Sequence, residues 1–236
     1  MDEWKTEVAK SNMISPPGGC TDEYFSSDGF FPYYFSQKIK ILFIARENRD
    51  LADIDGCTYI EYLFDWFKTS KLGNSGRLHY WMLKIAYGIL NDGGNIPYDK
   101  VPEPYKIIKD FATNNGISYA LVNLSKYAGK AASSDVKLIS SFLEHSNLEK
   151  CDFFQKEFSI LSPNLIIIMN PWRFAQLRPH LRLVFKGISE LQKENTCFIT
   201  EINGRHVPVI NMCHFTARAN VYKLAMELYK KSFAGK

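Results

Sequence analysis

The chain of 236 residues lacks the cysteine pattern of a disulfide-stapled or zinc-binding protein. Its five cysteines are scattered and odd in number, and none belongs to a C-x-x-C pair. We therefore expect reduced thiols, with no disulfide framework and no zinc site. The chain also begins without an apolar leader and contains no apolar run of membrane-spanning length. These absences predict a soluble, cytoplasmic protein that does not enter a membrane.

The signature loops of several enzyme classes are also missing. No G-x-G-x-x-G follows a strand and no G-x-x-x-x-G-K-[ST] is present, so a dinucleotide or nucleoside triphosphate would have no phosphate cradle. The chain has no G-x-S-x-G elbow, which argues against an α/β-hydrolase, and no H-E-x-x-H or other cluster of metal ligands. We expect neither a cofactor nor a catalytic metal.

Apolar and aromatic residues are plentiful. They make up 46% and 14% of the chain, enough for a large core, and the net charge of +4 permits a polyanionic partner. The length fits a single domain over residues 1–236, with residues 1–37 as an N-terminal arm. The arm is polar and irregular to residue 28 and then aromatic over residues 29–35. We favour a plug packed on the core for this aromatic leader over a platform for stacking bases.

Apolar runs alternate with amphipathic patterns along the rest of the chain. This alternation predicts a three-layer α/β/α fold around a central, mainly parallel sheet of four to five strands. The expected strands cover residues 38–45, 118–124, 165–169 and 207–212, with residues 197–202 as an edge strand. The expected helices cover residues 59–69, 78–90, 105–113, 135–144, 148–161 and 217–233, and a further helix begins at 171–177.

Polar residues follow three of these strands. Glu47 and Asn48 come after the first strand, Asn123 comes near the end of the second and precedes a basic loop at 125–130, and His214 follows the last. The carboxyl ends of parallel strands meet at one edge of a sheet, where ligands bind. A carboxylate, amides and an imidazole at this edge suit hydrolysis of an N-glycosidic bond, since a carboxylate can orient water and an imidazole can stabilise the departing base.

The order of the segments over residues 38–228 resembles the uracil-DNA glycosylase superfamily, closest to its bacterial and archaeal branches. Each match is degenerate alone, and the shared order gives the signal. The matching segments are a first motif at 41–50, a glycine followed by an aromatic at 56–59, a strand with asparagine at 120–127, a Leu-x-Pro and apolar strand at 158–169, and a final motif at 214–216.

The resemblance implies roles for the residues at the matching positions. Glu47 would activate water, with Asn48 as the second choice, and His214 would stabilise the oxygen of the leaving base. Asn123 would read the edge of the base, and Tyr59 would stack on it. Each role has a structural alternative: a salt bridge of Glu47 with a neighbouring arginine, a turn or capping amide, a core tyrosine, or a satisfied loop histidine.

Further residues of these motifs are expected to contact the substrate. Thr216 would bind a phosphate, Arg218 would wedge into the duplex or bind a phosphate, and Lys126 would contact the substrate from the basic loop. Arg218 could instead be a solvated helix start. A set of basic residues that could line a DNA track or form a solvated face comprises Arg173, Arg178 and Arg182.

The chain departs from the family pattern at three points. Phe215 stands where the family has proline, the first motif is rewritten around Glu47 without the usual glycine and proline, and the cysteines that would hold an iron–sulfur cluster are absent. The rewritten motif and the aromatic leader favour a base other than uracil. The resemblance extends to bacterial anti-phage glycosylases that excise hypermodified bases, such as glucosylated hydroxymethylcytosine.

The expected activity is therefore that of a monofunctional DNA glycosylase that flips a modified base, leaves an abasic site and works as a monomer on double-stranded DNA. Three alternatives stay open at this stage. One is a plain uracil-DNA glycosylase in repair, and another is a catalytically inactive module that binds modified nucleic acid. The third is a hydrolase or transferase acting on free nucleosides.

Overall fold

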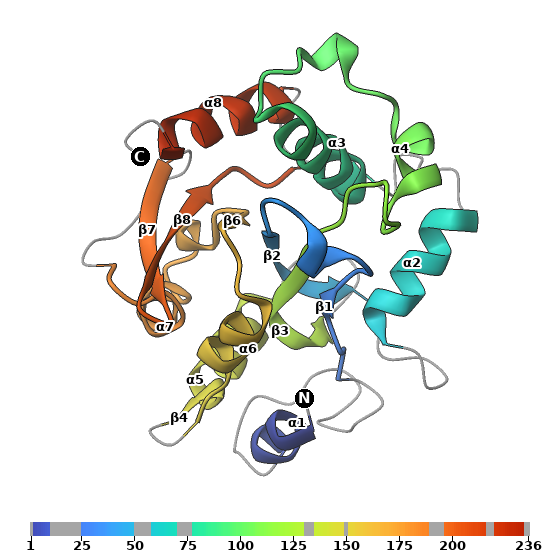
Figure 1. Cartoon of the computed structure of the whole chain (residues 1–236). Coiled ribbons are helices and arrows are strands. Elements are labelled where there is room, and N and C mark those ends of the chain that lie inside the picture. Colours follow the sequence, from blue (N-terminus) through green and yellow to red (C-terminus); the bar gives the residue numbers. More distant parts are fainter. Residues whose placement is uncertain are drawn as a thin grey trace.

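The computed structural model describes residues 2–9, 25–49, 58–69, 77–129, 135–148, 151–188, 196–215 and 220–233. Its centre is a six-stranded sheet in the order β1-β3-β2-β6-β8-β7 (Figure 1). The four central strands are parallel, and the strand at each edge runs antiparallel to its neighbour. The strands are β1 (Gly29–Phe30), β2 (Ile41–Arg49), β3 (Ala120–Gly129), β6 (Leu165–Ile168), β7 (Thr196–Ile202) and β8 (Arg205–Asn211).

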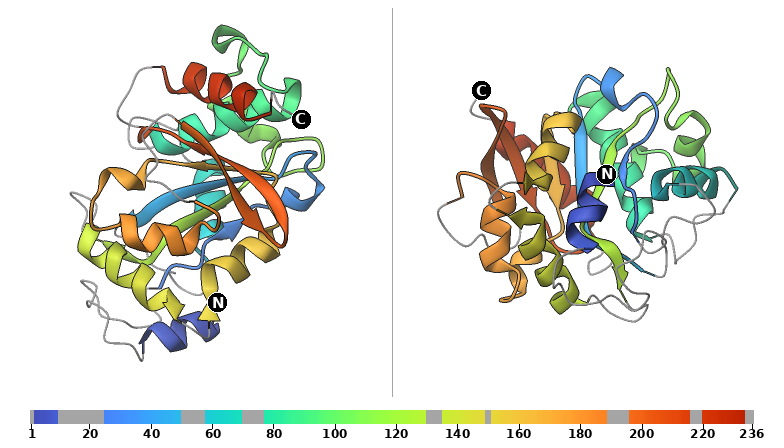
Figure 2. Two further views of the ribbon diagram at one scale, coloured as in Figure 1. Left: turned by 90° about the vertical axis from the view of Figure 1, so that its left-hand side faces the viewer. Right: turned by 90° about the horizontal axis from the view of Figure 1, so that it is seen from below.

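Helices cover both faces of this sheet, so the predicted three-layer α/β/α architecture is confirmed (Figure 2). The sheet has six strands instead of the expected four to five, because β1 of the aromatic leader pairs with β3. One face, called the α3 face below, packs against α2 (Tyr59–Thr69), α3 (Arg77–Asp92), α4 (Pro104–Asp110) and α8 (Val221–Phe233). The other, called the α5 face, packs against α1 (Asp2–Ala9), α5 (Val136–Ser146), α6 (Phe153–Leu161) and α7 (Arg178–Val184). Short 3₁₀ turns lie at η2 (Tyr34–Ser36), η4 (Tyr98–Lys100) and η5 (Pro171–Arg173).

The residues of β2 alternate between the two cores. Phe43 and Ala45 face the α3 core, whereas Leu42 and Ile44 face the α5 core, and all four are buried. Side chains of a strand point to opposite faces in turn, so a strand with apolar residues at every position is buried on both sides. The continuous apolar runs in the sequence have this cause.

β2 and β3 extend further than the sequence predicted. The expected ends were residues 45 and 124, but the strands continue to Arg49 and Gly129 because Glu47 pairs with Ser125 and Arg49 with Gly129. A bridge from Phe25 to Tyr127 supports the other side of β3. Backbone pairing on both sides overrides the polar composition, so the expected basic loop at 125–130 is strand as far as Gly129.

The N-terminal arm contains a helix that the sequence did not predict. The first described segment is the helix α1, and Trp4 on it is buried. The indole stacks on Phe153 at a centroid distance of 5.3 Å and donates a hydrogen bond from Nε1 to Ser146 Oγ at 2.9 Å. One large aromatic side chain thus docks a polar segment whose composition suggested an irregular arm.

The aromatic leader divides into two sets. Phe31 and Tyr34 are fully buried, as a plug on the core requires. The remaining rings are exposed at the sheet edge by 43–50%, and they are Phe30, Tyr33 and Phe35.

The helices predicted over residues 148–161 and from residue 171 begin later than expected. The helix predicted over residues 148–161 is preceded by a small hairpin of β4 (Asn147–Leu148) and β5 (Cys151–Asp152) and starts as α6 at Phe153. Asp152 sets that start, since its Oδ1 accepts a hydrogen bond from Gln155 N at 3.1 Å. The segment at 171–177 holds only the turn η5, and α7 follows it. No helix among the described residues has the length and apolar composition needed to cross a membrane.

Candidate functional site

Glu47 and His214 lie at the same level of the sheet's carboxyl edge. Ile44 of β2 pairs with Ile168 of β6, which pairs in turn with Asn211 of β8. Glu47 and His214 each follow this row by three residues. Neighbouring strands are about 4.8 Å apart, so the backbones of β2 and β8, with β6 between them, are separated by about 10 Å. The two residues thus follow β2 and β8 at the same level, with β6 between those strands.

The Glu47 side chain is half-buried, and its carboxylate reaches the start of α5. The backbone N–H of Asp135 donates to Glu47 Oε1 at 3.0 Å and lies 3.3 Å from Oε2. The Asp135 side chain in turn accepts a hydrogen bond from Leu138 N at 3.0 Å. The unpaired N–H groups of a helix N-terminus favour a negative charge beside them, so α5 fixes the position of this carboxylate.

Buried neighbours fix the backbone on both sides of His214. Met212 N continues the pairing of β8 by donating to Ile168 O at 2.8 Å, and Cys213 is buried. Phe215 is fully buried in the α3 core with its ring 6.2 Å from that of Phe43. Phe215 thus anchors the turn, while His214 itself is only half-buried.

A basic and aromatic cluster lies beside Glu47 at the same edge. The guanidinium of Arg46 lies 5.2 Å from the centroid of the Phe174 ring, and that of Arg173 lies 5.0 Å from it. Arg173 belongs to η5, which follows β6, and is exposed. By contrast, Arg178 donates from Nε to Trp172 O at 2.8 Å and has a structural contact. Arg182 is exposed on α7.

The structure gathers three other predicted residues around Asp28, which sequence reasoning missed. Asp28 directly precedes β1, and its side chain is 0% exposed. Its Oδ2 accepts a hydrogen bond from Asn123 N at 2.5 Å, and its Oδ1 accepts one from Lys126 Nζ. Tyr59 lies close by, with its backbone N–H donating to Ser27 O at 3.1 Å.

A break in edge pairing explains the position of Asp28. Phe25 pairs with Tyr127 and Gly29 with Leu121. The first residues of these two pairs are four positions apart, whereas their partners on β3 are six positions apart. β3 therefore carries two extra residues between these pairs, a bulge that interrupts the ladder. The Asp28 carboxylate takes the place of a backbone carbonyl opposite Asn123 N. The Asp28-Gly29 dipeptide, a turn signal, was the only local trace of this arrangement.

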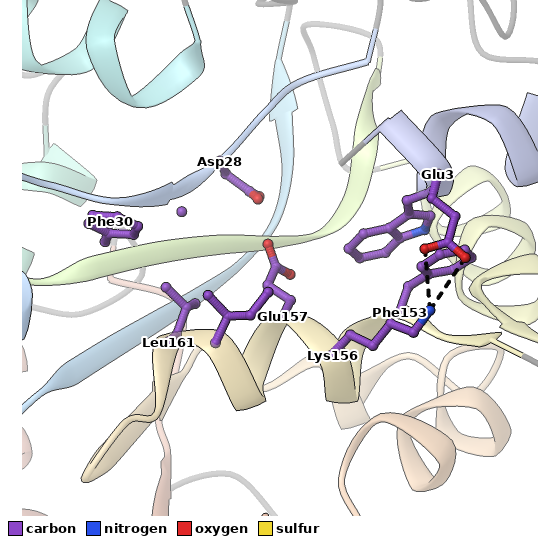
Figure 3. A pocket seen from close by; sticks show the side chains of 10 residues that line it. Glu3, Asp28, Phe30, Phe153, Lys156, Glu157 and Leu161 are labelled. Atoms are coloured by element: carbon purple, nitrogen blue, oxygen red, sulfur yellow. Dashed lines mark hydrogen bonds and ion pairs between the residues drawn. The ribbon is translucent and has the colours of Figure 1, made fainter.

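The Lys126 side chain points into the protein, whereas the sequence predicted that it would extend from a loop toward a ligand. Its ammonium is 0% exposed and lies 3.0 Å from Glu157 Oε1 and 2.9 Å from Glu157 Oε2. Trp4 and Phe154 present their rings to it at 4.9 Å and 5.7 Å. Figure 3 shows the Glu157 side chain extending from α6 toward Asp28. We call Asp28, Lys126 and Glu157 the buried ion triad.

Burial raises the pKa of Glu157 to about 8; Lys126 opposes this shift, and the charge of Asp28 adds to it. In this site, which has little access to water, the single ammonium of Lys126 pairs with two carboxylates. An ionised carboxylate that is buried and shares its cation is costly, so the proton is held on Glu157 well above its usual range.

Tyr59 and Asn123 are both deeply placed. Tyr59 is 7% exposed in the α3 core, and burial raises its pKa, with smaller contributions from Asp28 and Tyr62. Asn123 is 1% exposed and continues the alternation of Tyr119 and Leu121 on the α3 face. Both residues lie on one side of the sheet, beneath its carboxyl edge.

The remaining predicted residues are only partly covered by the structure. Asn48 lies near the end of β2, and its side chain lies outside the described residues. Thr216 and Arg218 lie outside them altogether. Within the described part of the chain, no group of three or more His, Cys, Asp or Glu side chains could hold a metal ion.

Comparison with known proteins leaves the geometry as the basis for assigning a function. No protein-family model matches this chain, and no curated protein sequence matches it either.

Proposed function

We propose that this chain is a monofunctional DNA glycosylase that hydrolyses the N-glycosidic bond of a flipped, modified base and leaves an abasic site. The observation that carries the proposal is the equal level of Glu47 and His214 across β6. Glycosidases that hold a water between a catalytic group and the sugar separate their two groups by about 6.5–9.5 Å. The backbones of β2 and β8 are about 10 Å apart, so side chains that extend from their ends could reach the two sides of one nucleoside.

The two side chains divide the chemistry between them. Glu47 orients a water toward C1′ of the sugar and accepts its proton as the water oxygen bonds to C1′. The bond between C1′ and the base nitrogen breaks, and the bonding electrons leave with the base. His214 donates a hydrogen bond to the base oxygen where that negative charge gathers.

The arginines at this edge support a polyanionic substrate. Arg46 and Arg173 flank the Phe174 ring from two different strand ends, next to Glu47. Guanidinium groups bind phosphates through paired N–H donors, and stacking on a ring holds their planes in place. Two such groups beside the proposed catalytic pair would hold the backbone of the DNA.

A second candidate is a module that binds modified DNA without cutting it. The observation that favours it is the hydrogen bonding of Glu47, whose carboxylate caps α5 through Asp135 N. A capping role alone would explain that position. The two candidates share a DNA-binding edge and differ in the product.

The test is an abasic-site assay. The purified chain is incubated with plasmid and phage DNAs that carry uracil, hydroxymethylcytosine or its glucosylated forms, and the DNA is then cleaved with alkali. Breaks confined to one modified DNA would support the glycosylase and name its base, and breaks only in the uracil DNA would indicate repair. DNA binding that weakens with salt but yields no breaks would favour the binding module.

A further inference from the structure

A cavity of about 300 Å³ opens beside the buried ion triad, between α1, the Asp28–Phe30 segment and α6 (Figure 3). Its walls are largely aromatic and aliphatic, with Trp4, Phe30, Phe153 and Leu161 among them. At its rim, Lys156 Nζ lies 3.4 Å from Glu3 Oε2 in an exposed ion pair. The volume is at the small end of the range of about 300–1,000 Å³ for ligand sites.

Glu157 is the member of the triad that meets this cavity most directly. Its side chain is 11% exposed, whereas those of Asp28 and Lys126 are 0% exposed. Lys126 already donates to both carboxylates, so the fully ionised triad carries an excess of one negative charge. That excess lies against an apolar wall, where it is poorly solvated.

We propose that this cavity binds a small organic cation whose planar amidinium or guanidinium group pairs with Glu157 and whose compact apolar body lies against Phe30 and Leu161. Lys126 Nζ already donates to both Glu157 oxygens, but a carboxylate has about four acceptor sites, so sites remain for a planar cation that carries several N–H donors. The ligand would cancel the excess charge of the triad. The site is separate from Glu47 and His214 and does not depend on the proposed glycosylase.

A proton and the ligand compete for Glu157. The charged groups that face this carboxylate are Lys126 of β3 and Asp28 before β1, while Lys156 of α6 is paired with Glu3 of α1 at the rim. In this setting the pKa of Glu157 is about 8. Binding a cation requires the ionised carboxylate, so affinity should rise about tenfold per pH unit below that pKa and level off above it.

Calorimetric titration of the whole chain with benzamidine and with benzamide tests the site. The two compounds share a ring and a planar head, but only benzamidine is charged over the range from about pH 6 to about pH 9. We expect benzamidine to bind with the pH dependence given above and benzamide to bind at least about tenfold more weakly. Equal binding of the two, or no benzamidine binding at about pH 9, would overturn the proposal.

Variants assign the binding to Glu157. Glu157→Gln keeps the shape of the side chain and should weaken benzamidine binding about 10- to 100-fold and remove its pH dependence. Glu227→Gln, on the exposed surface of α8, is the matched control and should bind as the parent does. Unchanged binding by Glu157→Gln would contradict the site, and circular dichroism of each variant checks its fold.

The same chemistry could come from a free metabolite or from an arginine side chain of a partner. Agmatine and the capped peptide acetyl-Gly-Arg-Gly-amide distinguish these sources. Tighter binding of agmatine would assign the cavity to a free guanidinium compound, and tighter binding of the peptide would assign it to an arginine side chain. If agmatine, the peptide and benzamidine all fail to bind, the cavity is not a cation site.

Discussion

Glu47 and His214 stand at one level on either side of β6, each three residues beyond a row of paired strand positions. Hydrogen bonds hold the Glu47 carboxylate and the backbone that carries His214 at this level. Asp135 N holds the carboxylate of Glu47, and the buried Phe215 holds the turn that carries His214. The proposed catalysis needs groups that are held in position in this way.

Replacing His214 by alanine should slow base excision by roughly 10²- to 10³-fold, because the leaving base loses the donor for its developing charge. Single-turnover excision on the DNA that the parent protein cleaves gives the rate. His206→Ala is the control, since His206 is exposed at the opposite end of β8 from His214. Equal rates for His214→Ala and His206→Ala would remove His214 from the mechanism.

The stability of the chain should depend on pH through Glu157. The pKa of this group is about 8 in the folded protein against 4.5 for the unperturbed group. Between these values the folded chain holds a proton that the unfolded chain has released, so the free energy of unfolding falls as the pH rises through this window. Above the upper value both states are ionised, and the loss is complete.

Urea unfolding across this window measures the effect. In Glu157→Gln the free energy of unfolding should depend less on pH. In Glu227→Gln it should depend on pH as it does in the parent. An identical slope in the parent and Glu157→Gln would show that Glu157 is ionised normally in the folded state.

Asp28→Ala should destabilise the fold by about 3–5 kcal/mol. It removes one of the two carboxylates that pair with the buried ammonium of Lys126, and it removes the hydrogen bond from Asn123 N to the Asp28 side chain. Asp99→Ala is the matched control. Asp99 pairs with Lys100 in an ion pair whose side chains are 74% exposed, so its loss should cost less than about 0.5 kcal/mol. Urea denaturation compares the two, and similar losses would contradict a structural role for the triad.

Trp4→Ala should destabilise the protein by about 3–5 kcal/mol, since it removes a large buried ring from between Phe25, Phe153 and Phe154. Tyr105→Ala, with a ring that is 62% exposed, should change stability little. Thermal unfolding of both variants gives the comparison. A parent-like melting temperature for Trp4→Ala would mean that α1 does not dock on the α5 face.

The sequence was informative wherever local pattern decides structure. The apolar run at 165–169 predicts β6, and the spacing of apolar residues at 59–69 predicts α2 within its observed bounds. The ends of β2 and β3 were predicted too early because their last residues are polar. Pairing between Glu47 and Ser125, which local composition does not reveal, keeps them in the sheet.

The same limit hid Asp28 from sequence reasoning. Its partners Asn123 and Lys126 are 95 and 98 residues away along the chain, and Trp4 meets Ser146 across 142 residues. Such contacts arise from the fold and leave no local pattern. Lys126 was expected on a loop because a lysine after a strand is usually solvated, and only the bulge beside Asp28 explains its burial.

The most direct test of the central claim is the time course of abasic-site formation by the parent protein and by Glu47→Gln on the same modified DNA. The amide keeps the size of the side chain but cannot take a proton from water, so we predict parent activity and a loss of roughly 10²- to 10⁴-fold in the variant, with DNA affinity unchanged. Excision by Glu47→Gln at the parent rate would contradict the account.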